Sequence, residues 1–204
     1  MKDQARVWDK LSKRYIKSPI SDVDTYEWKL GITQSYMRPD MDVLEIGCGS
    51  GNTGRRHAPL VRTYTAMDIS SAMIEAGKEL GAVPDNMRFV HADFDRADVA
   101  PRSYDIILAL SVLHLLPNPA FTVKKIAESL RPGGYFVSST VVLANMWILK
   151  LIAPLGQLFG AIPHLTFLSE DEMRQIMRDA GLEIAVDERP DGHEARFIIA
   201  RKPD

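Results

Sequence analysis

Residues 43–52, Val-Leu-Glu-Ile-Gly-Cys-Gly-Ser-Gly-Asn, constrain the fold of this chain more than any other stretch. An apolar run long enough for a buried strand ends in three alternating glycines, and the segment after them begins a helix. Glycine is needed in such a turn because a positive φ angle and a close backbone approach to a ligand exclude a Cβ atom. The free amides at the helix start attract a carboxylate or a phosphate. The sequence therefore predicts a ligand-binding strand, turn and helix.

Two classes of ligand use turns of this kind. A dinucleotide site has glycine at the first, third and sixth positions of the loop, and the sixth position here is Asn52. Gly47, Gly49 and Gly51, preceded by Glu45, instead form Gly-x-Gly-x-Gly. This pattern resembles the first motif of the class I S-adenosylmethionine-dependent methyltransferases, in which an acidic residue, an apolar residue and three glycines end the first strand.

The resemblance to this family implies a cofactor and residues that hold it. Glu45 and residues 47–51, including Cys48, would hold the methionine part of S-adenosylmethionine. The remaining implied contacts lie at the ends of later strands, so the assignment depends on whether matching residues follow at compatible distances.

Composition limits how many domains the chain can form and which classes of partner it can be expected to bind. The chain has 204 residues, of which 46% are hydrophobic, enough for one domain with a sizeable core. A net charge of -2 gives no general reason to expect a nucleic-acid partner. Cys48 is the single cysteine, which rules out an internal disulfide and suits a reducing compartment. The Met-Lys-Asp start lacks the apolar stretch of a secretory signal, so we expect a cytoplasmic protein. No spacing of His, Asp or Glu suggests a metal site, so we expect none.

Asp68 follows the predicted strand over 62–67 and lies 21 positions beyond Gly47. An acid at this place in nucleoside-binding sheets accepts hydrogen bonds from ribose hydroxyls. Asp68 and Ile69 also resemble the family's second motif. The alternative is that Asp68 only caps the predicted helix over 71–80.

Asp93 and Phe94 follow the predicted strand over 87–90. The resemblance implies that Asp93 binds the adenine amino group and that Phe94 packs on the ring. A loop-capping aspartate beside a core phenylalanine is the alternative.

Residues 104–110 are apolar with little interruption, which is typical of a strand buried on both faces of a parallel sheet. The segment after them resembles the family's segment beneath the methionine part of the cofactor. Leu110 and Ser111 would border the cofactor. His114 would face the acceptor, where it is the candidate general base, with a purely structural role as the alternative.

A predicted helix over 119–130 leads into Leu-Arg-Pro-Gly-Gly, the family's most recognisable feature after the first motif. Its proline stops the helix, and its glycines permit an abrupt reversal into a predicted strand over 135–142.

The N-terminal segment predicts two helices. Over 4–17, apolar residues recur at three- and four-residue spacing among arginines and lysines, which indicates a basic amphipathic helix. It could be an ordinary surface helix, a lid over the cofactor or a segment lying on an anionic membrane. The helix over 22–38 carries further aromatic residues. The resemblance implies that such helices touch the acceptor, so Tyr15, Tyr26 and Trp28 are candidate pocket residues, with core packing as the alternative.

Residues 143–168 form an apolar insertion in which Lys150 is the only charged side chain. Prolines and glycines interrupt it, so we expect helices and turns rather than a membrane span. It either completes the core as a helix hairpin or walls an apolar acceptor pocket, meets a partner or touches lipid. Trp147 and His164 are its candidate acceptor contacts.

The remaining sequence completes the predicted fold. A helix begins after Ser169 and ends at Gly181, and strands over 182–188 and 193–201 form a hairpin. We therefore predict an α/β, Rossmann-like, doubly wound sheet of seven strands, mostly parallel, with an antiparallel last strand. The single domain 1–204 would comprise a helical cap (1–38), a cofactor-binding core (39–142), the helical insertion (143–168) and a C-terminal helix and strand pair (169–204).

These motifs occur in the family's order and predict an S-adenosylmethionine-dependent methyltransferase that releases S-adenosyl-L-homocysteine. The expected acceptor is a small, mostly apolar molecule with an oxygen or sulfur nucleophile. A thiol needs the least help, because a pKa of about 8.5 leaves some thiolate at neutral pH. One alternative is a lipid or quinone precursor methylated at a membrane surface, for which His114 and His164 are the candidate bases. Another is a regulator that binds the adenosyl ligand without catalysis. A membrane contact through the basic helix and a homodimer complete the candidate partners, and a nucleic-acid substrate is not expected.

Overall fold

The structure is a computed structural model that describes residues 2–20, 22–143, 162–190 and 195–204. Among these residues no helix is long and apolar enough to cross a membrane. Most of the predicted insertion, including Trp147, lies outside the described residues.

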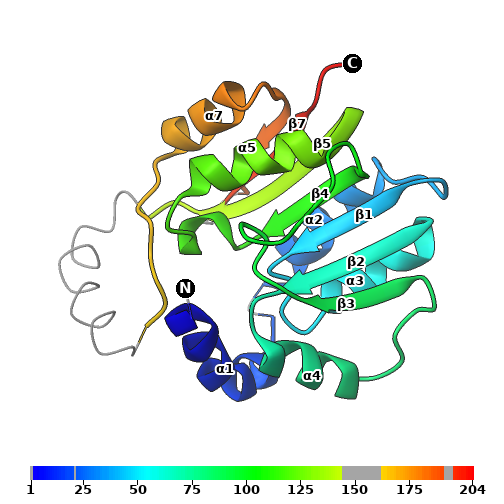
Figure 1. Cartoon of the computed structure of the whole chain (residues 1–204), viewed down its shortest axis with the longest axis vertical. Coiled ribbons are helices and arrows are strands. Elements are labelled where there is room, and N and C mark those ends of the chain that lie inside the picture. The colour runs from blue at the N-terminus through cyan, green and yellow to red at the C-terminus, as the bar shows by residue number, and fades with distance from the viewer. Residues whose placement is uncertain (1, 21, 144–161, 191–194) are drawn as a thin grey trace.

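A seven-stranded sheet organises the chain in the order β3-β2-β1-β4-β5-β7-β6 (Figure 1). The first five strands are parallel, and β7 runs antiparallel to both of its neighbours. The strands are β1 (Asp42–Ile46), β2 (Thr63–Asp68), β3 (Met87–His91), β4 (Tyr104–Leu110), β5 (Leu130–Val141), β6 (Glu183–Glu188) and β7 (Ala195–Arg201). This confirms the predicted fold class, including the antiparallel last strand.

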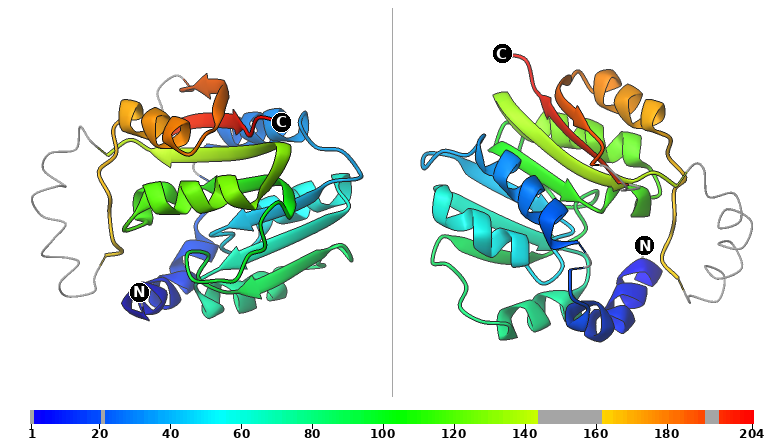
Figure 2. Two further views of the ribbon diagram at one scale, coloured as in Figure 1. Left: turned by 45° about the horizontal axis from the view of Figure 1, so that its top comes forward. Right: turned by 180° about the vertical axis from the view of Figure 1, so that it is seen from behind.

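Helices lie on both faces of the sheet and beyond its carboxyl edge (Figures 1 and 2). The α-helices are α1 (Lys2–Lys17), α2 (Val23–Gln34), α3 (Asn52–His57), α4 (Ser71–Glu79), α5 (Pro119–Ser129) and α7 (Glu170–Asp179). Two short 3-10 helices are η1 (Ala58–Leu60) and η2 (Leu113–Leu115).

Two apolar clusters fill the two faces of the sheet. Ile126 of α5 and Met177 of α7 are fully buried against one face. Trp28 of α2 packs on the other face, where its ring meets Phe197 edge to face at 5.3 Å between centroids. Because β4 contributes residues to both clusters, it is buried on both sides, as its continuous apolar sequence predicts.

Side-chain caps explain where several helices begin. Asp22, Ser70, Asn118 and Ser169 each precede a helix and accept a hydrogen bond from a backbone amide in its first turn. Glu172 completes a capping box with Ser169. The predicted helix over 22–38 is thus shorter at both ends than its apolar pattern indicates.

The Leu-Arg-Pro-Gly-Gly segment differs from its prediction as a turn between helix and strand. Leu130 already pairs with Tyr104, so the segment belongs to β5. The register then shifts, and pairing resumes between Tyr135 and Ile106. The extra residues bulge out of the ladder, with Gly133 at a φ of 74°.

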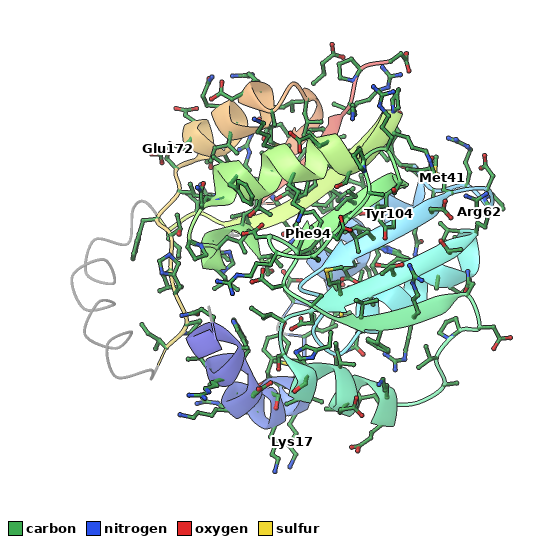
Figure 3. The ribbon with its side chains drawn as sticks, viewed as in Figure 1. Lys17, Met41, Arg62, Phe94, Tyr104 and Glu172 are labelled. Atoms are coloured by element: carbon green, nitrogen blue, oxygen red, sulfur yellow. The ribbon has the colours of Figure 1, made fainter. Side chains whose placement is uncertain are left out.

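An ion-pair network closes the amino edge of the sheet, opposite the carboxyl ends of the strands (Figure 3). Asp42 accepts hydrogen bonds from Arg62, Thr63 and Arg131, and Arg131 also pairs with Asp105. The arginines hold the pKa of Asp42 below its usual range. This charge cluster is structural, whereas Phe94 lies near the carboxyl ends (Figure 3).

Candidate functional site

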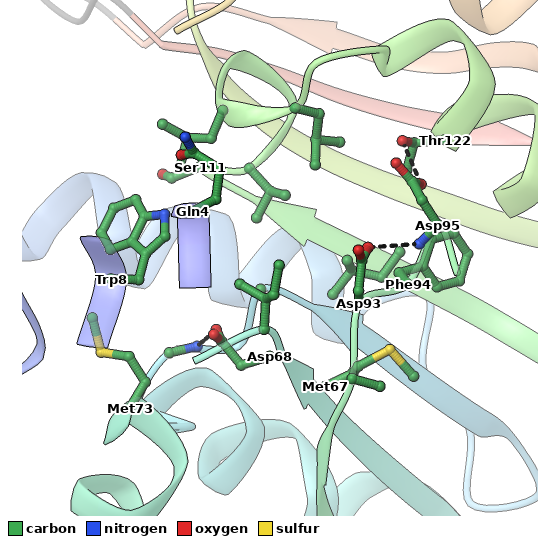
Figure 4. Close-up of a pocket in the computed structure, with 18 of the residues that line it drawn as sticks. Gln4, Trp8, Met67, Asp68, Met73, Asp93, Phe94, Asp95, Ser111 and Thr122 are labelled. Carbon is green, nitrogen blue, oxygen red and sulfur yellow. Dashed lines mark hydrogen bonds between the residues drawn. The ribbon is translucent and has the colours of Figure 1, made fainter. Parts of the chain in front are cut away.

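One pocket at the carboxyl ends of β1, β2 and β4 collects most of the predicted cofactor residues (Figure 4). Its empty space is about 1010 Å³, which includes solvent at the open mouth. Of the residues predicted from sequence, those that line it are Tyr15, Gly47, Gly49, Asp68, Ile69, Asp93, Phe94, Leu110 and Ser111.

The glycine turn forms one wall of this pocket. Gly47 has a φ of 65°, and a Cβ atom on it would lie 2.5 Å from Cγ2 of Val112. Gly51 also has a positive φ, of 74°, and is the N-cap of α3. Gly51 and Cys48 do not line the pocket, and burial raises the pKa of the Cys48 thiol. The turn therefore brings the backbone, rather than the thiol, to the pocket.

Asp68 ends β2 with its carboxylate held in place by two amides. The Gly49 amide donates to Oδ2 and the Ser70 amide donates to Oδ1, each at 2.8 Å. Only 8% of the residue is exposed, and burial raises the pKa of its carboxyl. The two bonds fix the orientation of a carboxylate that lines the pocket and still has unused lone pairs.

Asp93 and Phe94 lie at a second wall, beyond β3. Oδ1 of Asp93 accepts from the Asp95 amide at 3.2 Å, and its other oxygen lies 3.5 Å from Nε of Arg96. Phe94 is 4% exposed, and Lys125 lies 5.1 Å from its ring centroid. This wall combines a carboxylate with a fixed aromatic face.

Asp95 and Thr122 extend the same wall, and sequence reasoning missed both. The Thr122 hydroxyl donates to Oδ1 of Asp95 at 2.7 Å (Figure 4). Burial raises the pKa of Asp95. The other lining residues that were not predicted as site residues are Gln4, Trp8, Ile46, Met67, Met73, Ala92, Val112, Leu115, Leu116 and Pro117.

Glu45 lies behind the glycine turn rather than in the pocket lining. It is 3% exposed, and the Tyr64 hydroxyl donates to its Oε2 at 2.9 Å. Burial raises the pKa of Glu45 to about 8, because an ionised carboxylate is disfavoured away from water. Burial therefore favours the protonated form of this carboxyl at neutral pH.

Helix α1 covers the pocket from outside the sheet. Gln4 and Trp8 (Figure 4) line the pocket, and so does Tyr15, which lies on the same stripe of the helix. The four- and seven-residue steps from Gln4 to Trp8 to Tyr15 follow the apolar period that predicted the helix. The pattern identified the stripe, but not the surface that it covers.

Tyr26 and Trp28 do not come together with the pocket residues. The Tyr26 hydroxyl lies 3.3 Å from Oγ1 of Thr53, and Trp28 packs on Phe197. Helix α2 covers a face of the sheet, whereas α1 covers its carboxyl edge (Figure 2).

Neither predicted histidine lines the pocket. Nδ1 of His114 is buried without a hydrogen-bond partner among the described residues, and burial lowers the pKa of His114 to about 4. Nε2 of His164 lies 3.0 Å from the Thr166 hydroxyl, and the His164 amide donates to Gln4 at 2.8 Å. His114 is next to the lining residue Leu115, and His164 is tied to the lining residue Gln4.

Residues 25–186 match the family model described as methyltransferase domain. A ubiquinone biosynthesis O-methyltransferase of Saccharophagus degradans is 29% identical over 156 residues, which are 70% of this chain but only 63% of that protein. An S-adenosylmethionine-dependent methyltransferase of Mesorhizobium loti superposes with a TM-score of 0.69 at 18% identity, covering 86% of this chain and 97% of the other. The [4+2]-cyclase SpnF superposes with a TM-score of 0.70 at 16% identity, covering 85% of this chain and 79% of the cyclase. The chain belongs to the methyltransferase domain family and has the Rossmann-like fold of class I S-adenosylmethionine-dependent methyltransferases.

Proposed function

We propose that this chain transfers the methyl group of S-adenosylmethionine to the oxygen or sulfur of a small, mostly apolar acceptor. The observation that carries the proposal is the convergence of the glycine turn, the Asp68 carboxylate and the Asp93-Phe94 wall in one pocket. The relative from Saccharophagus degradans is a ubiquinone biosynthesis O-methyltransferase, which supports a small-molecule acceptor.

The residues present fit an adenosyl nucleoside. A Cβ at Gly47 would be 2.5 Å from Val112, so this position requires glycine, and it lines the pocket without a side chain. Asp68 would accept from ribose hydroxyls, and Asp93 and Phe94 would hold the adenine. When bound, the cofactor supplies an activated sulfonium methyl group. The glycine turn would hold its methionine part, and Glu45 would support the turn from behind. The core 39–142 would carry these contacts within the single domain that we infer.

The walls left for the acceptor are mostly apolar. Trp8, Leu115, Leu116 and Pro117 contribute the apolar surface, and Gln4 contributes an amide. Such a lining would exclude water and orient an apolar acceptor. The main role of the protein would then be to position the acceptor beside the cofactor.

The lack of an imidazole or amine base among the described lining residues favours an acceptor that ionises by itself. No histidine or lysine is among the lining residues in the described part of the chain. A thiol meets this condition, because some thiolate is present at neutral pH. We therefore place a thiol first among the O- and S-acceptors.

A lipid or quinone precursor methylated at a membrane surface is the second candidate, favoured by the relative's name and by the basic helix α1. A phenol on such an acceptor would need a base. His114 and His164 are the candidates, since burial keeps His114 neutral and both neighbour the lining.

The apolar insertion 143–168, with Trp147, would wall the acceptor site, and residues 1–38 would form its cap.

A turnover experiment separates these functions from a regulator that binds the adenosyl ligand without catalysis. Purified chain is incubated with methyl-labelled S-adenosylmethionine and a panel of thiols, phenols, quinols and lipid vesicles. Labelled product from a small acceptor supports the proposal. Tight binding of the cofactor without product from any acceptor would support the regulator instead.

Light scattering on the same preparation tests the predicted homodimer, which a monomer mass would contradict.

A further inference from the structure

Helix α1 has two chemically different faces. One face lines the pocket through Gln4, Trp8 and Tyr15, and Val7 and Ser12 are buried beside it. The other face carries exposed cations, which are Arg6, Lys10, Lys13, Arg14 and Lys17. Figure 3 shows Lys17 pointing away from the body of the protein. The helix therefore presents a cationic strip to solvent directly outside the pocket.

None of these five cations has an ion-pair partner in the described part of the chain. Asp9, an acid of the same helix, is turned away from them. It accepts from the Ser70 hydroxyl at 2.6 Å and from the Ala72 amide at 3.2 Å. The strip is thus uncompensated, although the whole chain has a net charge of -2.

Large apolar side chains are exposed next to the strip. Ile20 is 44% exposed and Val23 is 56% exposed. Ile20 lies in the connection between α1 and α2, and Val23 is the first residue of α2. Exposed apolar side chains beside unpaired cations are the combination that the headgroup region of a bilayer accommodates.

We propose that this surface, the five cations with Ile20 and Val23, docks on an anionic lipid bilayer. Each lysine or arginine near such a membrane is attracted to its negative surface, and apolar side chains insert between the headgroups. A polyanion such as nucleic acid would use the cations but leaves Ile20 and Val23 without a role. Docking does not depend on methyl transfer. Where the proposed function holds, docking places the helix that covers the pocket beside a reservoir of apolar molecules.

Vesicle sedimentation tests the proposal with the full chain, purified without a cationic tag. Vesicles of phosphatidylcholine alone are compared with vesicles that also contain phosphatidylglycerol, at low and high salt. We expect binding only to the anionic vesicles and weaker binding at high salt. In the variant Lys10→Glu, Lys13→Glu, Lys17→Glu, the affinity should fall by at least about tenfold.

A matched variant reverses three exposed cations elsewhere, Lys78→Glu, Lys124→Glu and Arg178→Glu. It changes the net charge equally and should bind anionic vesicles about as well as the parent. Ile20→Ser with Val23→Ser should weaken the binding that remains at high salt. Absence of parent binding to anionic vesicles, or equal losses in the two charge variants, would overturn the proposal. So would tighter binding to duplex DNA than to vesicles. Calorimetry with S-adenosylhomocysteine on each variant reports on the cofactor site separately.

Discussion

The Ser70 hydroxyl donates a hydrogen bond of 2.6 Å to Oδ1 of Asp9, while the Ser70 amide donates to Asp68 at 2.8 Å. One residue therefore joins the helix that covers the pocket to the carboxylate inside it. Asp9 also accepts from the Ala72 amide in the first turn of α4, where a negative charge is favoured by the helix dipole. The position of α1 and the orientation of Asp68 are thus set by the same turn.

Asp9→Ala should loosen α1 without unfolding the sheet. It removes an acceptor of two hydrogen bonds at a helix N-terminus, so the free energy of unfolding should fall by about 1–2 kcal/mol. Urea denaturation measures this, and hydrogen exchange should be faster at the amides of α1. Asp98→Ala, at an exposed loop position, serves as the control and should change stability by less than about 0.5 kcal/mol. Equal effects of the two substitutions would rule out the connection through Ser70.

Asp68→Ala should weaken binding of the adenosyl ligand by at least about tenfold, because a buried charged acceptor is lost. Isothermal calorimetry with S-adenosylhomocysteine measures the change. Glu75→Ala, an exposed acid on α4, should leave the affinity unchanged. An unaltered affinity in Asp68→Ala would remove Asp68 from the cofactor site.

Gly47→Ala should damage both the turn and the pocket. The added methyl group would lie 2.5 Å from Val112, at a φ of 65° that alanine rarely adopts. We expect a loss of about 1–3 kcal/mol in stability and a large loss of ligand affinity. Gly31→Ala is the matched control, since Gly31 lies inside α2 with open space around it. It should stabilise the protein by about 0.5–1 kcal/mol. The two glycines behaving alike in thermal unfolding and calorimetry would contradict this account of the turn.

Glu45 should make the stability depend on pH. Burial raises its pKa to about 8 in the folded protein, against about 4.3 for an exposed glutamate. The folded state therefore holds a proton that the unfolded state releases between these values. The free energy of unfolding should fall as the pH rises from about 5 to 8 and then level off. Glu45→Gln, which can still accept from Tyr64, should remove this part of the dependence. Parallel curves for parent and variant in urea titrations would disprove the assignment.

The sequence predicted the strands well because their apolar runs are local signals. The predicted strand 104–110 coincides with β4, which is buried on both faces and therefore apolar throughout. Gly47 and Asp68 could also be placed, because the carboxyl ends of parallel strands meet at one edge of the sheet. Their convergence in one pocket follows from topology.

The residues that sequence reasoning missed depend on contacts between distant segments. The helices α1 and α2 both carry aromatic residues, and no local pattern tells which of them meets the pocket. Trp28 packs on Phe197 at the face of the sheet. In contrast, the hydrogen bond between Asp9 and Ser70 holds α1 over the pocket, where Trp8 forms part of the wall. Likewise, Leu130 pairs with Tyr104, so β5 begins before the two glycines rather than after them as the sequence predicted.

Calorimetric titration of the purified chain with S-adenosylmethionine and, separately, with NAD tests the central claim most directly. If the pocket is built for an adenosyl sulfonium cofactor, S-adenosylmethionine should bind at one site per chain, and NAD should give no saturable heat at the same concentrations. Binding of NAD in preference to S-adenosylmethionine, or of neither ligand, would contradict the account.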